Sequence, residues 1–482
     1  MNTTLDLILE GGTVIDGTGA PRQRLDVGIA ADRIVRLGDL SRVPATRRFD
    51  ATGCIVAPGF IDVHTHDDRL LLEAPEGAHP KLSQGVTTVI TGNCGISLAP
   101  LHSLETPPAP LDLLGAGPWR YGRFGDYLNE LEESGPAVNA ACLVGHSTLR
   151  VSRMERLDRV ATMREQRLMA SDLAMALDAG AIGMSTGLYY PPATAANTDE
   201  VIAVGAPLTA ARGIITMHIR DEGDAIADAL SEALLIGRAL GIEAVLSHHK
   251  LVGKANHGRS VETLSMIDAA SRSQSVCLDC YPYNASSTML LPGRIAQSDD
   301  VRVTWSQADP SAAGRSLFSL ARERGVPPEV LAETLQPAGA IYFAMSEDDV
   351  GRILQYPATM VGSDGLAHDV SPHPRLWGTF PRVLGHYVRE RRLFSLETAV
   401  HKMTGLSASR FGITEKGILA ENHYADIAVF DEQSVGDAAT FENPTAVSTG
   451  IKAVFINGKL ACRDGETMEV HAGRVLRHGR SN

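Results

Sequence analysis

The chain has 482 residues, of which 44% are hydrophobic and 21% charged, and its formal net charge is −13 at pH 7. This length is too great for one simple core, so we expect a large domain and a smaller one. The negative charge argues against nucleic acid or an anionic membrane as the partner, because both attract basic surfaces.

Several further features favour a cytoplasmic protein. No apolar run reaches the ~18 residues that a membrane-spanning helix needs. The first six residues, Met1–Asp6, lack the basic start and apolar core of a signal peptide. The six cysteines are scattered, which is not the pattern of a disulfide framework. We therefore expect the protein in a reducing cytoplasm.

The two ends of the chain carry similar strand patterns. Residues 5–60 contain short β-type runs separated by Gly and Asp turn residues, and comparable runs recur at 425–431 and 453–459. We therefore predict that both ends form one small β-sandwich domain, with the larger domain inserted between them. The predicted domains are residues 1–58 together with 413–482, and residues 59–412.

Apolar β-type runs alternate with helical patterns through the middle of the chain, for example the helical pattern at Met163–Ala179. The runs are almost continuously apolar, which is typical of buried parallel strands. Eight such units predict an α/β protein whose large domain is a TIM-like (β/α)8 barrel. The predicted strands are residues 59–66, 86–93, 140–146, 181–187, 213–219, 243–249, 275–282 and 358–364.

Two long stretches interrupt this alternation. Residues 97–135 include a proline-rich loop, and residues 284–345 are much longer than a crossover between the last two strands requires. Long loops at the carboxyl face of a barrel usually shape or cover the site. We expect the 284–345 segment to be an insertion that covers it.

Metal-binding side chains stand at the ends of five predicted strands. Catalytic residues of parallel barrels lie at these carboxyl ends. His64 and His66 are two residues apart on the first strand, so their imidazoles point to the same face. Histidine, cysteine and aspartate together are typical ligands of Zn²⁺ or a similar divalent metal. The predicted ligands are His64, His66, Cys94, His218, His248 and Asp364.

The sixth strand ends in two adjacent histidines, which point to opposite faces. Lys250 shares a face with His248, and a ligand with a cation beside it suits the chemistry better, so we assign His248 as the ligand. His249 then packs outward against the helices. Cys94 follows Asn93 in a loop-type sequence, where a thiolate would be a strong ligand. We expect His146, at the end of the third strand, to serve in hydrogen bonding.

The stretch Pro58–His66 resembles the signature of the amidohydrolase superfamily, and Gly362–Asp364 resembles its strand-eight aspartate. Many members bridge two metals with a carbamylated lysine at the end of strand four. Here that strand ends in Met184–Gly187 without a lysine, and Cys94 offers a thiolate instead. This replacement resembles the N-acyl-D-amino-acid deacylase (D-aminoacylase) family, and the resemblance covers essentially the whole chain. Further segments of the same pattern are Gly183–Pro191, His218–Glu222, Ser247–Lys250 and His373–Arg375.

The resemblance implies a zinc enzyme that hydrolyses N-acyl-D-amino acids to a carboxylate and a free D-amino acid. One zinc would be held tightly by Cys94, His218 and His248. His64, His66 and Asp364 would form a second, weaker position. Asp364 would take a proton from water and pass it to the leaving amine. The preference for the D-hand is implied by the resemblance alone.

The predicted substrate is a small anion, which an acidic protein must receive with local cations. Lys250 shares the inward face of His248, and Arg375 follows shortly after Asp364, so we expect both beside the metal. A guanidinium can hold a carboxylate with two hydrogen bonds. The resemblance adds Tyr281 and Ser287 as hydroxyl donors near that carboxylate. It also places Tyr190 near the scissile carbonyl.

Two other functions remain compatible with the sequence. A cyclic amidase of the hydantoinase or dihydroorotase type shares the superfamily, although the missing strand-four lysine counts against it. A non-catalytic barrel that binds a partner is the other, but such proteins usually lose ligands and this chain keeps a full set. The sequence carries no indication of the oligomeric state.

Overall fold

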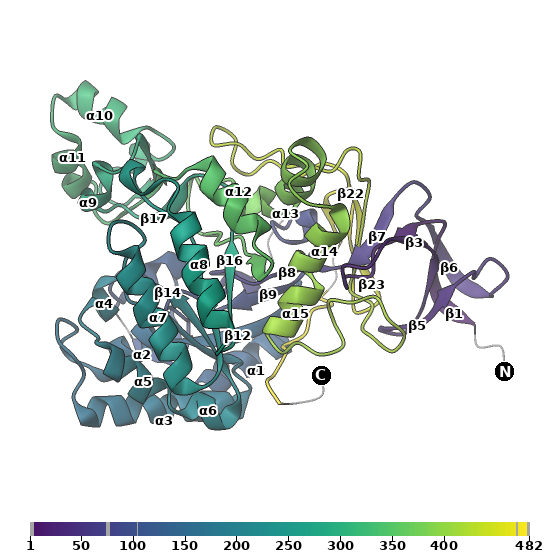
Figure 1. The fold of residues 1–482 in the computed structure, drawn as a ribbon, viewed down its shortest axis with the longest axis horizontal. Helices are drawn as coiled ribbons and strands as arrows, with labels where there is room; N and C mark the ends of the chain where they lie inside the picture. The colour runs from purple at the N-terminus through teal and green to yellow at the C-terminus, as the bar shows by residue number, and fades with distance from the viewer. Residues whose placement is uncertain (1–3, 74–77, 104, 469–470, 480–482) are drawn as a thin grey trace.

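The computed structural model describes residues 4–73, 78–103, 105–468 and 471–479. Of the predicted small domain, residues 1–3, 469–470 and 480–482 therefore lie outside the described ranges. Figure 1 shows the barrel in the centre and lower left of the molecule, the small β domain at the right, and an inserted lobe above the barrel at the upper left. Within the described ranges, no helix combines the length and apolar character needed to cross a membrane.

Eight parallel strands form the barrel, and their order in space is their order in the chain. An isolated parallel bridge between Thr65 and Gly365 joins the first strand to the last and closes the ring. This confirms the predicted (β/α)8 barrel, with each strand inside its predicted range to within one residue. The strands are β8 (Phe60–Asp62), β9 (Val86–Thr91), β12 (Asn139–Gly145), β13 (Gly183–Gly187), β14 (Ile214–His218), β15 (Glu243–Leu246), β16 (Val276–Cys280) and β20 (Thr359–Val361).

Helices cover the outside of the barrel (Figure 1). The longest, α3 (Met163–Ala179), has the predicted bounds because Thr162 and Glu165 form a capping box at its start and Gly180 ends it at φ 117°. The other helices around the barrel are α1 (Phe124–Ser134), α2 (His146–Arg153), α4 (Pro191–Thr194), α5 (Thr198–Gly205), α6 (Pro207–Ala211), α7 (Ile226–Leu240), α8 (Ser260–Ser271), α12 (Glu347–Gln355), α13 (Arg375–Arg382), α14 (Leu396–Met403) and α15 (Gly405–Arg410).

The interior of the barrel is filled with apolar side chains below the polar strand ends. One buried cluster takes a residue from, or next to, every barrel strand, including Ile61, Ile90, Val245 and Met360. A cluster with this membership can lie only inside the ring. Phe411 belongs to the same cluster. The polar carboxyl ends of the strands therefore lie directly above a close-packed apolar core.

The small domain consists of two facing sheets made from both ends of the chain. One sheet has the order β5-β4-β1-β6 and the other β24-β23-β22-β21-β7-β2-β3. Strand β7 pairs with β21 in antiparallel fashion, which joins the two ends. An apolar cluster lies between the sheets, with Leu9 and Ile29 on one side and Val429 and Phe455 on the other. The strands are β1 (Leu5–Glu10), β2 (Thr13–Val14), β3 (Gln23–Arg24), β4 (Asp26–Ala30), β5 (Arg33–Gly38), β6 (Ala45–Asp50), β7 (Ile55–Pro58), β21 (Ile427–Phe430), β22 (Ile451–Ile456), β23 (Lys459–Arg463) and β24 (Glu466–Thr467).

The last described residues leave this domain and return to the barrel. Val475 forms a parallel bridge with Ala140 at the start of β12, and Leu476 N donates to Ala140 O at 2.8 Å. Leu476 joins the apolar cluster inside the barrel. The segment around residue 475 was expected in the small domain, but its backbone pairing and its burial place it at the bottom of the barrel.

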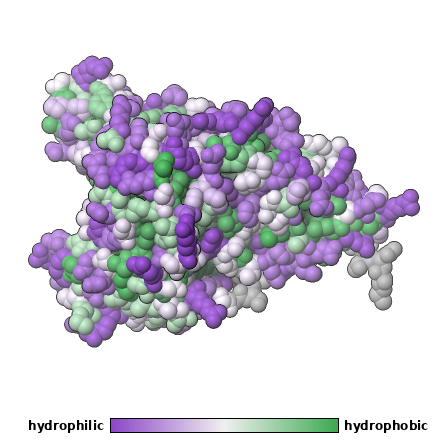
Figure 2. All heavy atoms as spheres, viewed as in Figure 1, coloured by the Kyte–Doolittle hydropathy of each residue, from purple (hydrophilic) through white to green (hydrophobic). Residues whose placement is uncertain are grey.

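The segment between β16 and β20 forms a lobe of its own, seen at the upper left of Figure 1. It carries a three-stranded sheet in the order β17-β19-β18 and a separate apolar cluster that includes Leu317, Leu331 and Tyr342. Figure 2 shows that the visible surface of the lobe mixes hydrophilic and hydrophobic residues. The elements of the lobe are β17 (Ser286–Met289), α9 (Pro292–Ile295), β18 (Asp300–Ser306), α10 (Leu317–Arg324), α11 (Pro328–Thr334) and β19 (Ala338–Phe343).

Candidate metal centre

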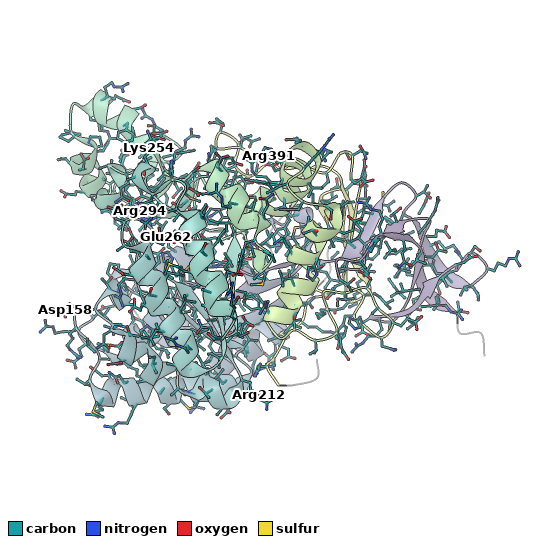
Figure 3. All side chains as sticks on the ribbon, viewed as in Figure 1. Asp158, Arg212, Lys254, Glu262, Arg294 and Arg391 are labelled. Atoms are coloured by element: carbon teal, nitrogen blue, oxygen red, sulfur yellow. The ribbon has the colours of Figure 1, made fainter. Side chains whose placement is uncertain are left out.

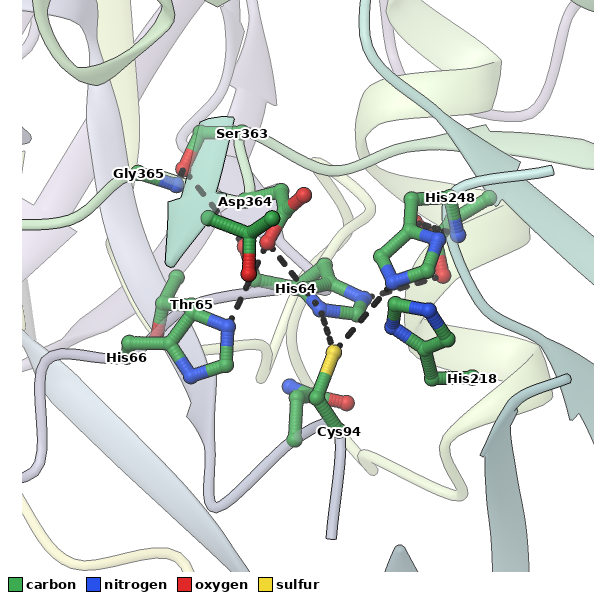
Figure 4. A network of polar contacts seen from close by, with 12 residues as sticks. His64, Thr65, His66, Cys94, His218, His248, Ser363, Asp364 and Gly365 are labelled. Carbon is green, nitrogen blue, oxygen red and sulfur yellow. Dashed lines mark hydrogen bonds and ion pairs between the residues drawn. The ribbon is translucent and has the colours of Figure 1, made fainter. Parts of the chain in front are cut away.

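The six predicted ligands converge at the carboxyl ends of the barrel strands and form two overlapping groups (Figure 4). One group is Cys94, His218 and His248, and in each group all ligand atoms lie within 4.8 Å of one another. Cys94 Sγ lies 3.2 Å from His248 Nε2 and 3.2 Å from His64 Nε2. The thiol is therefore common to both groups. The second group is His64, His66, Cys94 and Asp364.

Three of these residues have unusual backbone conformations. Cys94, His248 and Asp364 have φ of 53°, 35° and 52°. Positive φ is uncommon outside glycine and clusters at functional sites, because the surrounding structure must hold it in place. At Cys94 the turn also depends on Gly92, where an added Cβ would lie 2.1 Å from Leu143 O. The sharp turn after β9 places the thiol among the histidines.

The donor atoms suit a zinc-type ion. Burial raises the pKa of the Cys94 thiol, but the neighbouring His64 and His248 imidazoles outweigh this effect and hold it well below its usual range. Burial likewise opposes ionisation of Asp364, and the Arg375 guanidinium outweighs it, so its pKa also lies well below the usual range. Among the described residues, both ring nitrogens of His218 lack a hydrogen-bond partner although they are buried. A thiolate, imidazoles and a carboxylate in one buried place are the ligands that zinc prefers.

Three of the predicted substrate residues, Arg375, Ser287 and Tyr281, lie together beside Asp364, whereas Tyr190 and Lys250 lie elsewhere around the centre. Arg375 Nη1 is 2.8 Å from Asp364 Oδ2, and Arg375 Nη2 donates to Ser287 O at 3.0 Å. The guanidinium lies over the Tyr281 ring, 4.6 Å from its centroid. Tyr190 stands farther round the site, with its ring centroid 4.8 Å from that of His218. Its hydroxyl lies 3.0 Å from Thr288 Oγ1.

Lys250 does not stand free as a substrate-facing cation. Its ammonium forms a close ion pair with Glu222, donates to His248 O at 3.1 Å, and lies 2.7 Å from His248 Nδ1. The charge of Glu222 thus offsets the charge that we expected to receive the substrate. The sequence did not reveal this partner, because Glu222 lies on the loop after a different strand.

Two other histidines point away from the centre. His249 Nε2 lies 2.9 Å from Thr263 Oγ1 of helix α8, on the outer side of the barrel. His146 starts helix α2, and its Nε2 is 3.4 Å from Glu200 Oε1. Glu200 is also ion-paired with the fully buried Arg150. His146 therefore belongs to a buried polar cluster in the helix layer.

Two carboxylates that lie beside the ligands could not be recognised from the sequence. Asp279, on β16, has Oδ2 3.5 Å from His64 Nδ1, and its Oδ1 accepts the backbone N–H of His248 at 2.9 Å. Glu222 approaches His218 and His248 in a similar way. Both carboxylates are buried. A signal for Glu222 existed, because it ends the His218–Glu222 segment, but its role required the fold.

A buried lysine joins the first strand to the last. Lys81 Nζ donates to Asp62 Oδ2 at 2.8 Å and to Ser363 Oγ at 2.9 Å, and Asp62 Oδ1 accepts the backbone N–H of Ser363 at 2.7 Å. Asp364 N also donates to His64 O at 2.8 Å. These contacts hold Asp364 next to the two histidines of the first strand.

A closed parallel barrel with a cysteine–histidine–aspartate centre at its carboxyl face defines a metal-dependent hydrolase of the amidohydrolase type. Residues 47–334 and 316–461 match the amidohydrolase family. The D-aminoacylase of Alcaligenes xylosoxydans xylosoxydans is 53% identical over 472 residues, which are 98% of this chain and 97% of that protein. The chain belongs to the amidohydrolase family, within its N-acyl-D-amino-acid deacylase (D-aminoacylase) group.

Solved structures agree with this placement. A D-aminoacylase studied for its binuclear metal center superposes with a TM-score of 0.95 at 54% identity, covering 98% of this chain and 100% of that one. An N-acyl-D-glutamate deacylase from Bordetella bronchiseptica, complexed with zinc and a phosphonate inhibitor, gives a TM-score of 0.94 at 46% identity with the same coverage. The L-hydantoinase of Arthrobacter aurescens, over 98% of this chain and 100% of its own, reaches a TM-score of only 0.59 at 16% identity, so it shares the fold alone.

Proposed function

We propose that the protein hydrolyses the amide bond of N-acyl-D-amino acids and releases a carboxylate and a free D-amino acid. The observation that carries this proposal is the position of Arg375, whose guanidinium lies 2.8 Å from Asp364 Oδ2 at the edge of the metal centre. A cation there can receive the substrate carboxylate next to the group that handles the proton. The relatives named D-aminoacylase and N-acyl-D-glutamate deacylase support the same reaction.

Cys94, His218 and His248 would hold one zinc ion tightly, and His64, His66 and Asp364 would offer a second, weaker position that shares the Cys94 sulfur. A bound zinc ion lowers the pKa of a water molecule from 15.7 to about 7 and polarises a carbonyl oxygen. The buried setting of the ligands excludes other water from the reacting atoms.

Asp364 is the proposed base and acid. Its Oδ1 faces His66 Nε2 at 3.3 Å, whereas Oδ2 is held by Arg375. The carboxylate is thereby fixed in orientation, and it can accept a proton from the attacking water and return it to the leaving amine. Its depressed pKa keeps the carboxylate in its ionised form.

The proposed substrate-binding residues surround this carboxylate. Arg375 Nε and Ser287 Oγ are buried and have no hydrogen-bond partner among the described residues, so both can donate to a substrate carboxylate. The Tyr281 hydroxyl, whose contact is Met345 Sδ at 3.9 Å, can add a third hydrogen bond. We place Tyr190 near the scissile carbonyl. Lys250 remains a proposed substrate-binding residue, and its ion pair with Glu222 offsets its charge.

We further propose that the protein works in the cytoplasm on a small-molecule substrate. All six cysteines are free in the structure, and five of them are buried. A reducing compartment keeps the Cys94 thiol from oxidation, which would remove it as a ligand.

Assays of the zinc-loaded protein on paired N-acetyl-D- and N-acetyl-L-amino acids test the proposal, with a hydantoin as the third substrate class. We expect turnover of the D-series and little of the L-series or the hydantoin. Turnover of the hydantoin alone would instead support a cyclic amidase. No turnover of any compound by a protein that binds zinc would support the non-catalytic alternative.

A further inference from the structure

We infer that Glu222 is a positioning residue that orients both histidines of the tight metal position through one carboxylate oxygen. The inference rests on the proposed metal site, of which it names an additional part. Glu222 Oε1 lies 3.3 Å from His248 Nδ1 and 3.5 Å from His218 Nε2. On His248 the opposite nitrogen, Nε2, is the one that faces Cys94 Sγ.

A carboxylate beside one ring nitrogen of histidine favours a proton on that nitrogen. The other nitrogen is then left with a free lone pair for a metal. The single oxygen of Glu222 thus favours a proton on Nε2 of His218 and on Nδ1 of His248, where it competes with the Lys250 ammonium 2.7 Å from the same nitrogen. Neither ring nitrogen of His218 has a hydrogen-bond partner among the described residues, and Nε2 is the one within ion-pair distance of Glu222, which leaves Nδ1 for a ligand.

Glu222 is itself held in place from two sides. Lys250 pairs with Oε1, and Arg294 Nη2 lies 3.0 Å from Oε2. Arg294 belongs to helix α9 and lies where the inserted lobe meets the barrel (Figure 3). Its Nε donates to the Tyr189 hydroxyl at 2.8 Å, and the Tyr189 ring stacks on His218 at 5.6 Å between centroids. Glu222 retains only 3% of its exposure, so water cannot take the place of these contacts.

Charge balance alone would be a simpler role for Glu222, since it lies between two cations. The two roles predict different behaviour for a shortened side chain. Aspartate at position 222 keeps the negative charge between Lys250 and Arg294 but withdraws the oxygen from the two rings. Glutamine keeps the length but loses the charge and replaces one oxygen by a donor.

The experiment compares zinc binding by the wild-type protein, E222D, E222Q and a control, E232Q. Glu232 pairs with Arg220 at 2.8 Å and has no contact with a ligand in the structure, so it matches the loss of one carboxylate. Metal-free full-length proteins are titrated with zinc against a chromophoric chelator. The absorption spectrum of the Co²⁺-substituted proteins reports the geometry of the thiolate and imidazole ligands.

We expect E232Q to match the wild type. E222D and E222Q should each weaken zinc binding at the tight position by about 10–100-fold and should change the Co²⁺ spectrum. With zinc saturating, kcat should fall more than KM rises, because the substrate contacts are intact. If E222Q fails to fold, E222D alone carries the test.

Two results would overturn the inference. In the first, E222D and E222Q bind zinc as tightly as E232Q, with an unchanged spectrum. In the second, E222D equals the wild type while E222Q fails to bind, which would make charge balance the role of Glu222. A wild-type protein that binds no zinc would contradict the proposed function itself, which is a distinct outcome.

Discussion

The two ligand groups around Cys94 share a sulfur atom but differ in what surrounds the other ligands. In the first group, His218 and His248 are backed by one buried carboxylate, Glu222. In the second, Asp364 is engaged by a guanidinium at 2.8 Å as well as by His64 and His66. A cation this close opposes a second positive ion. This difference supports the proposed assignment, in which the first position holds its metal more tightly than the second although both use the same sulfur.

The largest expected effect comes from removing the shared sulfur. Cys94→Ala should leave the fold largely intact, because Cys94 is a small buried side chain in a loop. Both ligand groups lose a member, so zinc content should drop and turnover should be abolished. Elemental analysis and an activity assay measure both, and thermal unfolding checks the fold.

The matched control for this change is Cys142→Ala. Cys142 is equally buried on β12, and burial raises the pKa of its thiol to about 12, so it is a packing residue. The control should keep zinc and activity. Retention of both by Cys94→Ala would show that the thiolate is not a ligand.

Asp364→Asn should separate the two groups. Asparagine keeps the size of the side chain but cannot accept a proton, and it removes a ligand from the second group only. The first zinc should stay bound, while kcat should fall about 10²–10⁴-fold with little change in KM. Single-turnover kinetics and zinc content test this together. Activity within tenfold of the wild type would exclude Asp364 as the proton carrier.

Arg375→Lys should weaken both the contact with Asp364 of the second group and the binding of the substrate carboxylate. Lysine cannot reproduce the two parallel hydrogen bonds of a guanidinium. A charge-assisted bond is worth roughly 1.5–3 kcal/mol, so kcat/KM for N-acetyl-D-amino acids should fall about ten- to hundredfold.

The amides of the same amino acids serve as the control substrates, because they lack the carboxylate and should lose much less. An equal loss on acids and amides would mean that Arg375 acts chiefly by orienting Asp364.

The smallest expected effect on the centre comes from Glu200→Gln. Glu200 lies in helix α5 and contacts His146, so the change alters a residue outside both ligand groups. Zinc content and kcat should stay at wild-type levels. The free energy of unfolding should fall by about 3–5 kcal/mol, since the variant leaves Arg150 buried without its anionic partner. Loss of zinc in this variant would show that the helix layer supports the centre after all.

The stability difference should also depend on pH. Burial raises the pKa of Glu200, but hydrogen bonds from His146, Arg150 and the backbone outweigh it and lower the pKa to about 2. The folded pKa thus lies below the unfolded value of about 4.3. The contribution of Glu200 is present above about pH 4.3 and is lost as the pH falls toward 2. Wild type and variant should therefore converge in acid when unfolding is followed by circular dichroism.

Much of the fold was predictable because it follows from local patterns. The eight barrel strands are apolar runs separated along the chain by helical segments. The predicted ligands lie where these runs end. Face alternation separated His248 from His249, and the cation Lys250 on the same face led to the choice of His248. The return of Leu476 to the barrel was not predictable, because a short apolar tail has no pattern that distinguishes one apolar surface from another.

The missing parts of the centre depend on contacts between distant segments. Glu222 lies in a loop, and only the fold brings it between Lys250 and Arg294. The sequence predicted that Lys250 points inward on the same face as His248, but it did not predict the ion pair with Glu222 that offsets the charge of Lys250. A sequence shows which residues can bind or ionise, whereas partners of opposite charge from other loops decide which charges stay available.

The barrel closes between Thr65, near the start of the chain, and Gly365, much later in the chain, so its last strand is also the last one to be synthesised. Synthesis proceeds from the N-terminus, so Cys94, His218 and His248 have all been added to a growing polypeptide long before Asp364. A product that terminates before β20 contains every ligand of the first position but no base. Under the proposed assignment, neither the ring nor the site is complete until the segment around Gly365 pairs with the segment around Thr65.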